Sequence, residues 1–178
     1  MEFTHDEQRE LASFGLLTRK PILTVFNMGE GQPAPDAQGK LDHPSVALMG
    51  KLEMEIAQLS AEDAAVFMEE YGIKELSLNR MINLSYDLLQ VQTFFTVGED
   101  EVRAWPIPDG TRAQDAAGTV HSDIARGFIR AEVNTYGELV AVDGSFADLR
   151  ARGQLRLEGK EYVVRDGEVC HFRFNIGR

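Results

Sequence analysis

The chain has 178 residues, which is enough for one or two small domains with a hydrophobic core. It holds 18 Lys and Arg against 29 Asp and Glu, a formal net charge of −11. No run of 18 apolar residues occurs, and the opening residues MEFTHDEQRE are polar and acidic, so we expect neither a membrane span nor a signal peptide. The single cysteine, Cys170, excludes an intrachain disulfide and fits a reducing, cytoplasmic environment.

The negative charge is concentrated in the first part of the chain. Residues 103–178 carry 11 basic and 11 acidic side chains, which leaves 7 basic and 18 acidic ones in residues 1–102. A strongly acidic surface repels phosphate backbones, so any RNA contact is expected in the second part. Its basic residues either form a patch or are solvated charges balanced by neighbouring acids. They are Arg126, Arg130, Arg150, Arg152, Arg156 and Lys160.

In residues 1–88 the pattern predicts a helix, a short strand, a loop, a second strand and three helices. Their ranges are Thr4–Leu17, Ile22–Phe26, Gly31–Pro44, Ser45–Met49, Lys51–Leu59, Ser60–Gly72 and Ser77–Leu89. Thr4 and Glu7 have the spacing of a capping box. The run ILTVF after Pro21 is β-branched and aromatic, which is typical of a buried strand. The last helix has an apolar stripe that we expect in the core, namely Leu78, Met81, Ile82, Leu88 and Leu89.

The second part alternates strands and short helices, which predicts an α+β unit. Strands are expected at Val91–Val97, Val102–Ile107, Phe128–Val133, Tyr162–Arg165 and Glu168–Ile176. Asp166-Gly167 favours a tight turn, so the last two strands are predicted to form a hairpin. A short helix, Arg112–Ala117, is expected to begin at a Thr111 cap and to end at Gly118. Two more short helices are expected around Gly144.

The stretch around Ala116–Phe128 supplies a resemblance. AAG-x-x-H-x-D-x-x-x-GFIRAEV, preceded by EVRAW and followed by LRLEGKEYVVRDGEVCHFRFN, closely resembles the C-terminal TGS domain of the YchF/Obg-like P-loop ATPases. This resemblance implies a ubiquitin-like β-grasp fold for residues 89–178. It implies that residues 1–88 are a remnant of the nucleotidase domain, with strands of a P-loop α/β sheet, and a helical connector.

The resemblance also implies a site for a purine base at the end of the first strand. The family carries an N-x-x-E motif there, in place of the N-K-x-D with which most P-loop GTPases recognise guanine. Asn27 would face the base, Met28 would offer backbone groups and Glu30 would take the acidic position. The family's small pair after the next strand is Met49-Gly50 here, so only Gly50 matches. An Asn-x-Gly turn that binds no ligand has the same sequence.

The sequence contains no catalytic or metal-binding motif. No G-x-x-x-x-G-K-[ST] occurs, so we predict that the chain hydrolyses neither ATP nor GTP. The four histidines lack metal-ligand spacing, so no metal and no resident cofactor is expected. His121 and Asp123 could mimic an acid–base pair, but we expect Asp123 to cap a turn and His121 to bond nearby backbone.

The resemblance favours a binding module that contacts the ribosome, RNA or a regulatory partner through residues 89–178. The candidate contact residues are Arg103, Trp105, Arg126, Arg130, Arg156 and Lys160. Trp105 could stack on a base or belong to the core. Two alternatives stay open. The chain could be a fragment that binds ATP or GTP weakly, or an interaction protein that forms a homodimer through the strand edges of residues 16–50.

Overall fold

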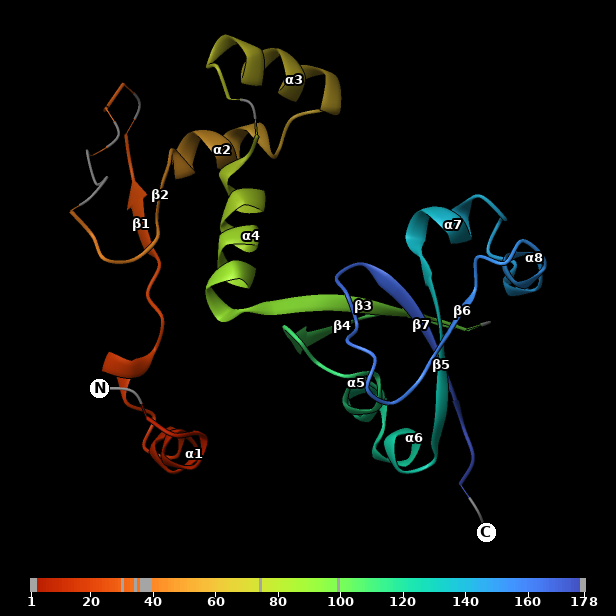
Figure 1. Ribbon diagram of the computed structural model, residues 1–178. Coiled ribbons are helices and arrows are strands. Elements are labelled where there is room, and N and C mark those ends of the chain that lie inside the picture. The colour runs from red at the N-terminus through yellow and green to blue at the C-terminus, as the bar shows by residue number, and fades with distance from the viewer. Residues whose placement is uncertain are drawn as a thin grey trace. The chain divides into compact units, whose positions relative to one another are not determined.

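The structure is a computed structural model that describes residues 3–29, 31–33, 35, 40–73, 75–98 and 100–176. The chain divides into two compact units, Met1–Leu89 and Gln90–Arg178, which we call unit 1 and unit 2 (Figure 1). The secondary structure is mixed α and β, as the sequence predicts. No helix of the described residues is long and apolar enough to cross a membrane.

Unit 1 combines four α-helices with a small parallel sheet among its described residues. Its elements are α1 (His5–Ala12), the 3-10 turn Leu17–Arg19, β1 (Thr24–Asn27), β2 (Ser45–Leu48), α2 (Gly50–Ile56), α3 (Ala61–Glu70) and α4 (Ser77–Leu89). β1 and β2 pair in parallel, from Thr24 opposite Ser45 to Asn27 opposite Leu48. The capping box of Thr4 and Glu7 is confirmed at the start of α1.

Three predictions for unit 1 need correction. The first helix ends at Ala12 instead of Leu17, because Gly15 takes a positive φ of 59° and the chain turns there. The strand after Pro21 is only half-buried, with its Val25 side chain exposed. The predicted stripe of α4 is also not a core face: Leu78, Ile82 and Leu89 are exposed, since Met81, Leu84 and Leu88 take the partly buried side of the helix.

Unit 2 is built on a five-stranded mixed sheet in the order β4-β3-β7-β5-β6. The strands are β3 (Val91–Val97), β4 (Val102–Pro108), β5 (Phe128–Thr135), β6 (Arg156–Glu158) and β7 (Glu168–Phe174), and the helices are α5 (Ala113–Val120), α6 (Ser122–Arg126), α7 (Tyr136–Val140) and α8 (Phe146–Ala151). β3 and β7 are parallel neighbours, whereas the other pairs are antiparallel. The predicted strand at Val91–Val97 and the two short helices around Gly144 are confirmed.

The predicted hairpin of Tyr162–Arg165 with Glu168–Ile176 is wrong. β7 lies between β3 and β5, and the segment before it makes only an isolated bridge, Val163 to Arg112. The Asp-Gly turn is tied to β3, because the Thr93 amide donates to the Asp166 carboxylate at 2.8 Å and the Gly167 amide donates to the Thr93 carbonyl at 2.8 Å. These bonds direct the chain into the centre of the sheet instead of back on itself.

The short helix after β4 also differs from the prediction. The Thr111 hydroxyl donates to the Pro108 carbonyl and caps nothing, and α5 continues through Gly118 to Val120. A Cβ at Gly118 would lie 3.4 Å from the Ala125 Cβ, so α5 and α6 are in van der Waals contact at this glycine. His121 begins α6 as predicted for a structural residue: its Nδ1 accepts from the Asp123 amide at 3.1 Å. Asp123 does not cap; it pairs with Arg126.

Two apolar clusters hold unit 2 together, one on each face of the sheet. The first packs α5 against strand residues such as Phe94, Ala131 and Phe172. The second packs α7 and α8 against Val169, with Phe95 and Leu155 at its edge. We call these the α5 face and the α7 face. Cys170 is wholly buried in the first cluster, and this burial raises the pKa of its thiol to about 12, so it behaves as a small apolar residue.

Candidate functional site

The predicted base-binding residues of unit 1 meet where β1 and β2 end. The Gly50 amide donates to the Asn27 Oδ1 at 3.2 Å, and the Met28 amide donates to the Leu48 carbonyl at 2.9 Å. A Cβ at Gly50 would lie 3.0 Å from the Asn27 Oδ1, so only glycine fits without displacing that side chain. The structure therefore brings Asn27, Met28 and Gly50 together; Glu30 lies outside the described residues. The carboxyl ends of parallel strands are a common ligand position in α/β sheets.

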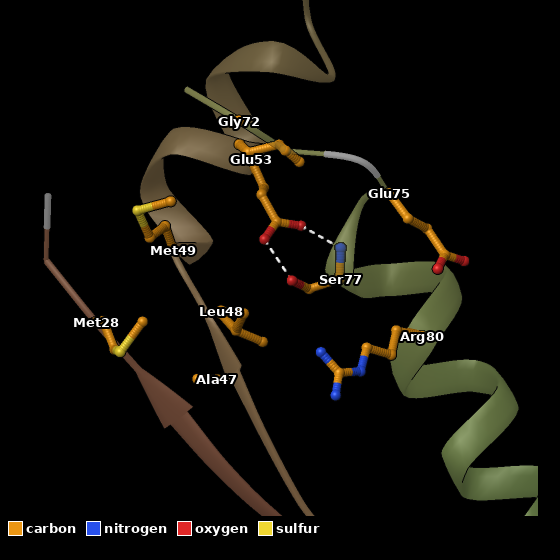
Figure 2. Close-up of a pocket in the computed structure, with 10 residues that line it drawn as sticks. Met28, Ala47, Leu48, Met49, Glu53, Gly72, Glu75, Ser77 and Arg80 are labelled. Carbon is orange, nitrogen blue, oxygen red and sulfur yellow. Dashed lines mark hydrogen bonds between the residues drawn. The ribbon is translucent and has the colours of Figure 1, made fainter. Parts of the chain in front are cut away.

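A cavity of about 480 Å³ adjoins this junction (Figure 2). Met28, Leu48 and Met49 line one part of it, and Glu53 and Arg80 line another. The Glu53 carboxylate is already engaged, since it accepts from the Ser77 amide at 2.6 Å and from the Ser77 hydroxyl at 2.5 Å. A carboxylate at the start of α4 also meets the positive end of the helix dipole. Glu53 is thus a structural residue that ties α2 to α4.

The candidate contact residues of unit 2 do not form one patch. On the α5 face, the Arg103 guanidinium lies 4.2 Å from the Trp105 ring centroid. Trp105 packs against the first apolar cluster, and its Nε1 donates to the Thr96 Oγ1 at 2.9 Å, so the ring is partly core. Arg126 pairs with Asp123, and Lys160 is exposed. Arg130 lies on the α7 face, beside Glu132.

Arg156 belongs to a partly buried network around Glu168. Its guanidinium pairs with Glu168, and the Tyr162 hydroxyl donates to the same carboxylate at 2.7 Å. The Arg165 amide donates to the other carboxylate oxygen at 3.0 Å. The pKa of Arg156 is raised, chiefly by the hydrogen bond to Glu168. Both terminal nitrogens of Arg156 already donate within this network, one to Tyr162 and one to Glu168.

A second buried carboxylate, Glu132, has more cationic neighbours than it can neutralise. Arg150 lies 3.1 Å and Arg130 3.9 Å from its Oε1, while Arg173 lies 3.0 Å and His171 3.3 Å from its Oε2. Burial favours the neutral acid, but Arg173, Arg150 and His171 outweigh burial and lower the pKa of Glu132. The pKa of His171 is lowered by burial and by Arg173, against the opposing effect of Glu132. We call Arg130, Arg150 and Arg173 around Glu132 the Glu132 cluster.

Sequence reasoning missed this cluster as a unit. Arg130 was a candidate, and Arg150 belonged to the basic stretch, but Glu132 and Arg173 were not singled out. The signal was present as a period of two: Arg130 and Glu132 alternate with apolar residues in β5, and His171 and Arg173 do so in β7. The structure pairs Arg130 with Arg173 and Glu132 with His171 across the two strands.

The α7 face also carries an apolar groove of about 620 Å³. Phe95, Val97 and Val102 line it from the sheet, and Tyr136 and Val140 line it from α7. In the part of the chain that the structure describes, no group of three or more His, Cys, Asp or Glu is placed to hold a metal ion.

Two solved structures have a fold similar to that of this chain. It is similar to a solved structure of the Schizosaccharomyces pombe YchF GTPase, with a TM-score of 0.77 and 27% identity over 97% of this chain and 48% of that one. It is also similar to a GTP-binding protein from Pyrococcus horikoshii OT3, with a TM-score of 0.63 and 16% identity over 97% of this chain and 51% of that one, which bears on the fold alone. The class is therefore an α+β chain with the architecture found in part of a GTP-binding protein.

The sequence comparisons narrow this class to one family. The family model "YchF-GTPase_C: Protein of unknown function (DUF933)" matches residues 91–175. The "Ribosome-binding ATPase YchF" of Bacillus subtilis (strain 168) is 44% identical over 188 residues, and that of Pasteurella multocida (strain Pm70) is 38% identical over 184 residues. Each alignment covers 99% of this chain, and the chain spans about half the length of these curated relatives. The chain belongs to the YchF family.

Proposed function

We propose that this chain is a ribosome- or RNA-contacting module of a YchF-type protein, and that unit 2 is its contact domain. The observation that carries the proposal is the match of residues 91–175 to the YchF family, whose curated members here are named ribosome-binding ATPases. We assign residues 89–178 to a TGS-type β-grasp domain. The central position of the last strand, β7, between β3 and β5, with α5 packed on one face, supports this assignment.

Co-sedimentation of the full chain with ribosomes tests the proposal. We expect the chain to pellet with ribosomes at low salt and to be released as salt rises, because contacts with phosphates release counterions. An unrelated acidic protein of similar size is the control for trapping in the pellet. If the chain stays in the supernatant at low salt, the proposal is wrong.

We also propose that the chain by itself does not hydrolyse nucleotides. The 178 residues contain no phosphate-binding G-x-x-x-x-G-K-[ST] loop, and positioning of the phosphates and Mg²⁺ supplies most of the catalysis in phosphoryl transfer. Phosphate release from ATP and GTP is the measurement. Turnover above a buffer blank that survives repurification of the chain would contradict this.

A second candidate function, weak purine binding by unit 1, has its own support. Residues 1–88 would be the remnant of a nucleotidase domain and its connector. The bond from the Gly50 amide to Asn27 holds the two strand ends in register, at the position where the family's base-recognition motif falls. Without phosphate contacts we expect a dissociation constant of about 1 mM, or about −4 kcal/mol. Calorimetry with adenosine, ATP and GTP measures it. Asn27→Ala should abolish binding, whereas Asn83→Ala on exposed helix surface should not.

The third alternative, a homodimer through residues 16–50, rests on exposed apolar side chains. Leu17, Ile22 and Val25 are exposed there, and among the described residues neither β1 nor β2 pairs with a further strand. Light scattering on the full chain and on residues 90–178 tests it. A dimeric full chain with a monomeric unit 2 would support this surface, and a monomeric full chain would exclude it.

A further inference from the structure

We propose that the Glu132 cluster on the α7 face of unit 2 is the surface that binds the phosphate backbone of RNA. This inference rests on the proposed function and specifies which face carries it. Of the candidate contact residues expected from the sequence, only Arg130 belongs to the cluster.

The first step is the charge count at the cluster. Three guanidinium groups approach one carboxylate, so the site has a formal excess of two positive charges when His171 is neutral. Glu168, the other carboxylate buried in the sheet, has one guanidinium partner, Arg156, and no excess. In a chain of net charge −11, a local positive excess of this kind is not explained by the average composition.

The second step is the availability of the donors. The side chain of Glu132 is 1% exposed, but those of Arg130, Arg150 and Arg173 are 49%, 59% and 46% exposed. Each guanidinium has five N–H donors, and one carboxylate has about four acceptor positions for all three arginines together. Most of the donors therefore face solvent and can bind an anion.

The three arginines of the cluster are positioned before a ligand binds. Arg130 and Arg173 are cross-strand partners on β5 and β7, and Arg150 comes from α8. Arg150 donates a hydrogen bond to the buried carboxylate, and guanidinium nitrogens of Arg173 and Arg130 lie 3.0 Å and 3.9 Å from it, so the same group holds all three near one another before any ligand arrives. Holding long side chains in place beforehand lowers the entropy cost of binding. Guanidinium groups also match phosphate oxygens in a bidentate manner, which an ammonium group does not.

The side chains beside the cluster indicate which kind of anion it binds. A planar ring lies beside the arginines: His171 contacts Phe146 with ring centroids 5.7 Å apart, and the His171 side chain is 40% exposed. Arginines next to an accessible planar ring are typical of surfaces that bind RNA, where the ring can stack on an unpaired base. An acidic protein would need the arginines but not the ring. The observations therefore favour RNA.

The test compares two triple variants of the full chain for binding to ribosomal RNA. One is Arg130→Gln, Arg150→Gln, Arg173→Gln; the matched control is Arg103→Gln, Arg112→Gln, Arg126→Gln on the α5 side. At about 0.7 per phosphate contact, the cluster triple should reduce the slope of log K against log salt by about 2, and binding at 0.1 M salt by roughly 100-fold. The control triple should change neither quantity by a comparable amount.

Two further variants separate a binding role from a folding role, because removing the arginines leaves His171 as the remaining ionisable neighbour of the buried Glu132. The triple Arg→Lys variant keeps the charge and should keep most of the salt slope. Glu132→Gln keeps all three arginines, so it should keep the salt slope that the cluster triple loses. Thermal unfolding establishes that each variant is folded at the assay temperature.

The outcomes distinguish this inference from the proposed function. If the natural chain binds ribosomes but the cluster triple binds as tightly, or the control triple loses as much, the inference is wrong and the proposed function stands. If the natural chain binds neither ribosomes nor RNA, both are wrong. If poly-glutamate displaces RNA at equal charge concentration, the cluster is a site for acidic polypeptides, and the RNA assignment is overturned.

Discussion

Unit 1 and unit 2 are similar in length but differ sharply in how much apolar surface they bury. Among the described residues of unit 1, only Val46 and Ile56 are buried apolar side chains. Unit 2 has two clusters, one on each face of a five-stranded sheet. Burial of apolar area is the main favourable contribution to folding, so unit 2 has the means to fold by itself.

Many apolar side chains of unit 1 are exposed to water instead. Phe14, Leu17, Val66 and Leu78 are 72%, 76%, 64% and 64% exposed. Its described sheet consists of one parallel pair of strands. Parallel sheets are normally larger and are covered by helices on both faces. Among its described residues, unit 1 therefore has the secondary structure of an α/β domain without a matching core, whereas unit 2 has both.

The largest expected effect appears when the two units are separated. Residues 90–178 should unfold in one cooperative transition, because their core is internal to that segment. Residues 1–89 should show no sharp transition, because two buried apolar side chains cannot offset the loss of conformational entropy. Circular dichroism during heating measures both. A sharp, reversible transition of residues 1–89 would contradict the claim that unit 1 lacks a core of its own.

A large-to-small substitution in each unit tests whether the two units differ in buried apolar surface. Phe94 is 0% exposed at the centre of the first cluster, so Phe94→Ala should lower the free energy of unfolding of unit 2 by about 3–5 kcal/mol. Phe14→Ala, at an exposed position of unit 1, should change the free energy of unfolding of the full chain by less than about 0.5 kcal/mol. Urea unfolding of the full chain provides the values. Equal losses would mean that exposure does not determine the cost.

Within unit 2, a buried ion pair should be worth more than an exposed one. Glu168→Ala removes the acceptor of Arg156, Tyr162 and the Arg165 amide, and should cost about 2 kcal/mol because those donors lose their partner in a half-buried site. The matched control is Glu161→Ala, which breaks an exposed pair with Arg112 and should cost less than about 1 kcal/mol. Reversal of this order would contradict the network described above.

Acid should weaken unit 2 through Glu132. Its pKa is lowered in the folded state, so it contributes stability that is complete above its ordinary value of 4.5 and is lost as pH falls through the folded pKa. His171, whose pKa is also lowered, acts in the same direction below 6.5. Unfolding free energies between pH 3 and pH 7 should therefore fall less steeply for Glu132→Gln below about pH 4.5. An unchanged slope would show that Glu132 has the same pKa in the folded and the unfolded chain.

Local patterns predicted much of unit 2 because they depend on neighbouring residues. The strand at Val91–Val97 and the helices around Gly144 follow from periodicity and from one glycine with a φ of 81°. The failures have long-range causes. The hairpin was wrong because Asp166 and Gly167 bond to Thr93, more than 70 positions earlier. No local rule contains that partner.

The candidate sites divide in the same way. Asn27 and Gly50 could be proposed because a family motif marks them, and they do lie together. The Glu132 cluster could not, because a charged residue in a strand ordinarily indicates a solvent-facing position. Glu132 is instead buried on the α7 face, and the arginines that compensate it come from β5, β7 and α8.

The smallest expected effect compares the same capping box in the two units. Thr4 with Glu7 begins α1, and Thr135 with Glu138 begins α7, with matching hydrogen bonds. Thr135→Ala should lower the free energy of unfolding of unit 2 by about 1 kcal/mol, because α7 holds Leu139 in the second cluster. Thr4→Ala should increase amide exchange within α1 and leave the free energy of unfolding of unit 2 unchanged, since no buried side chain is described in α1. If both substitutions lowered the cooperative transition equally, α1 would have to be coupled to a core, and the contrast between the units would fail.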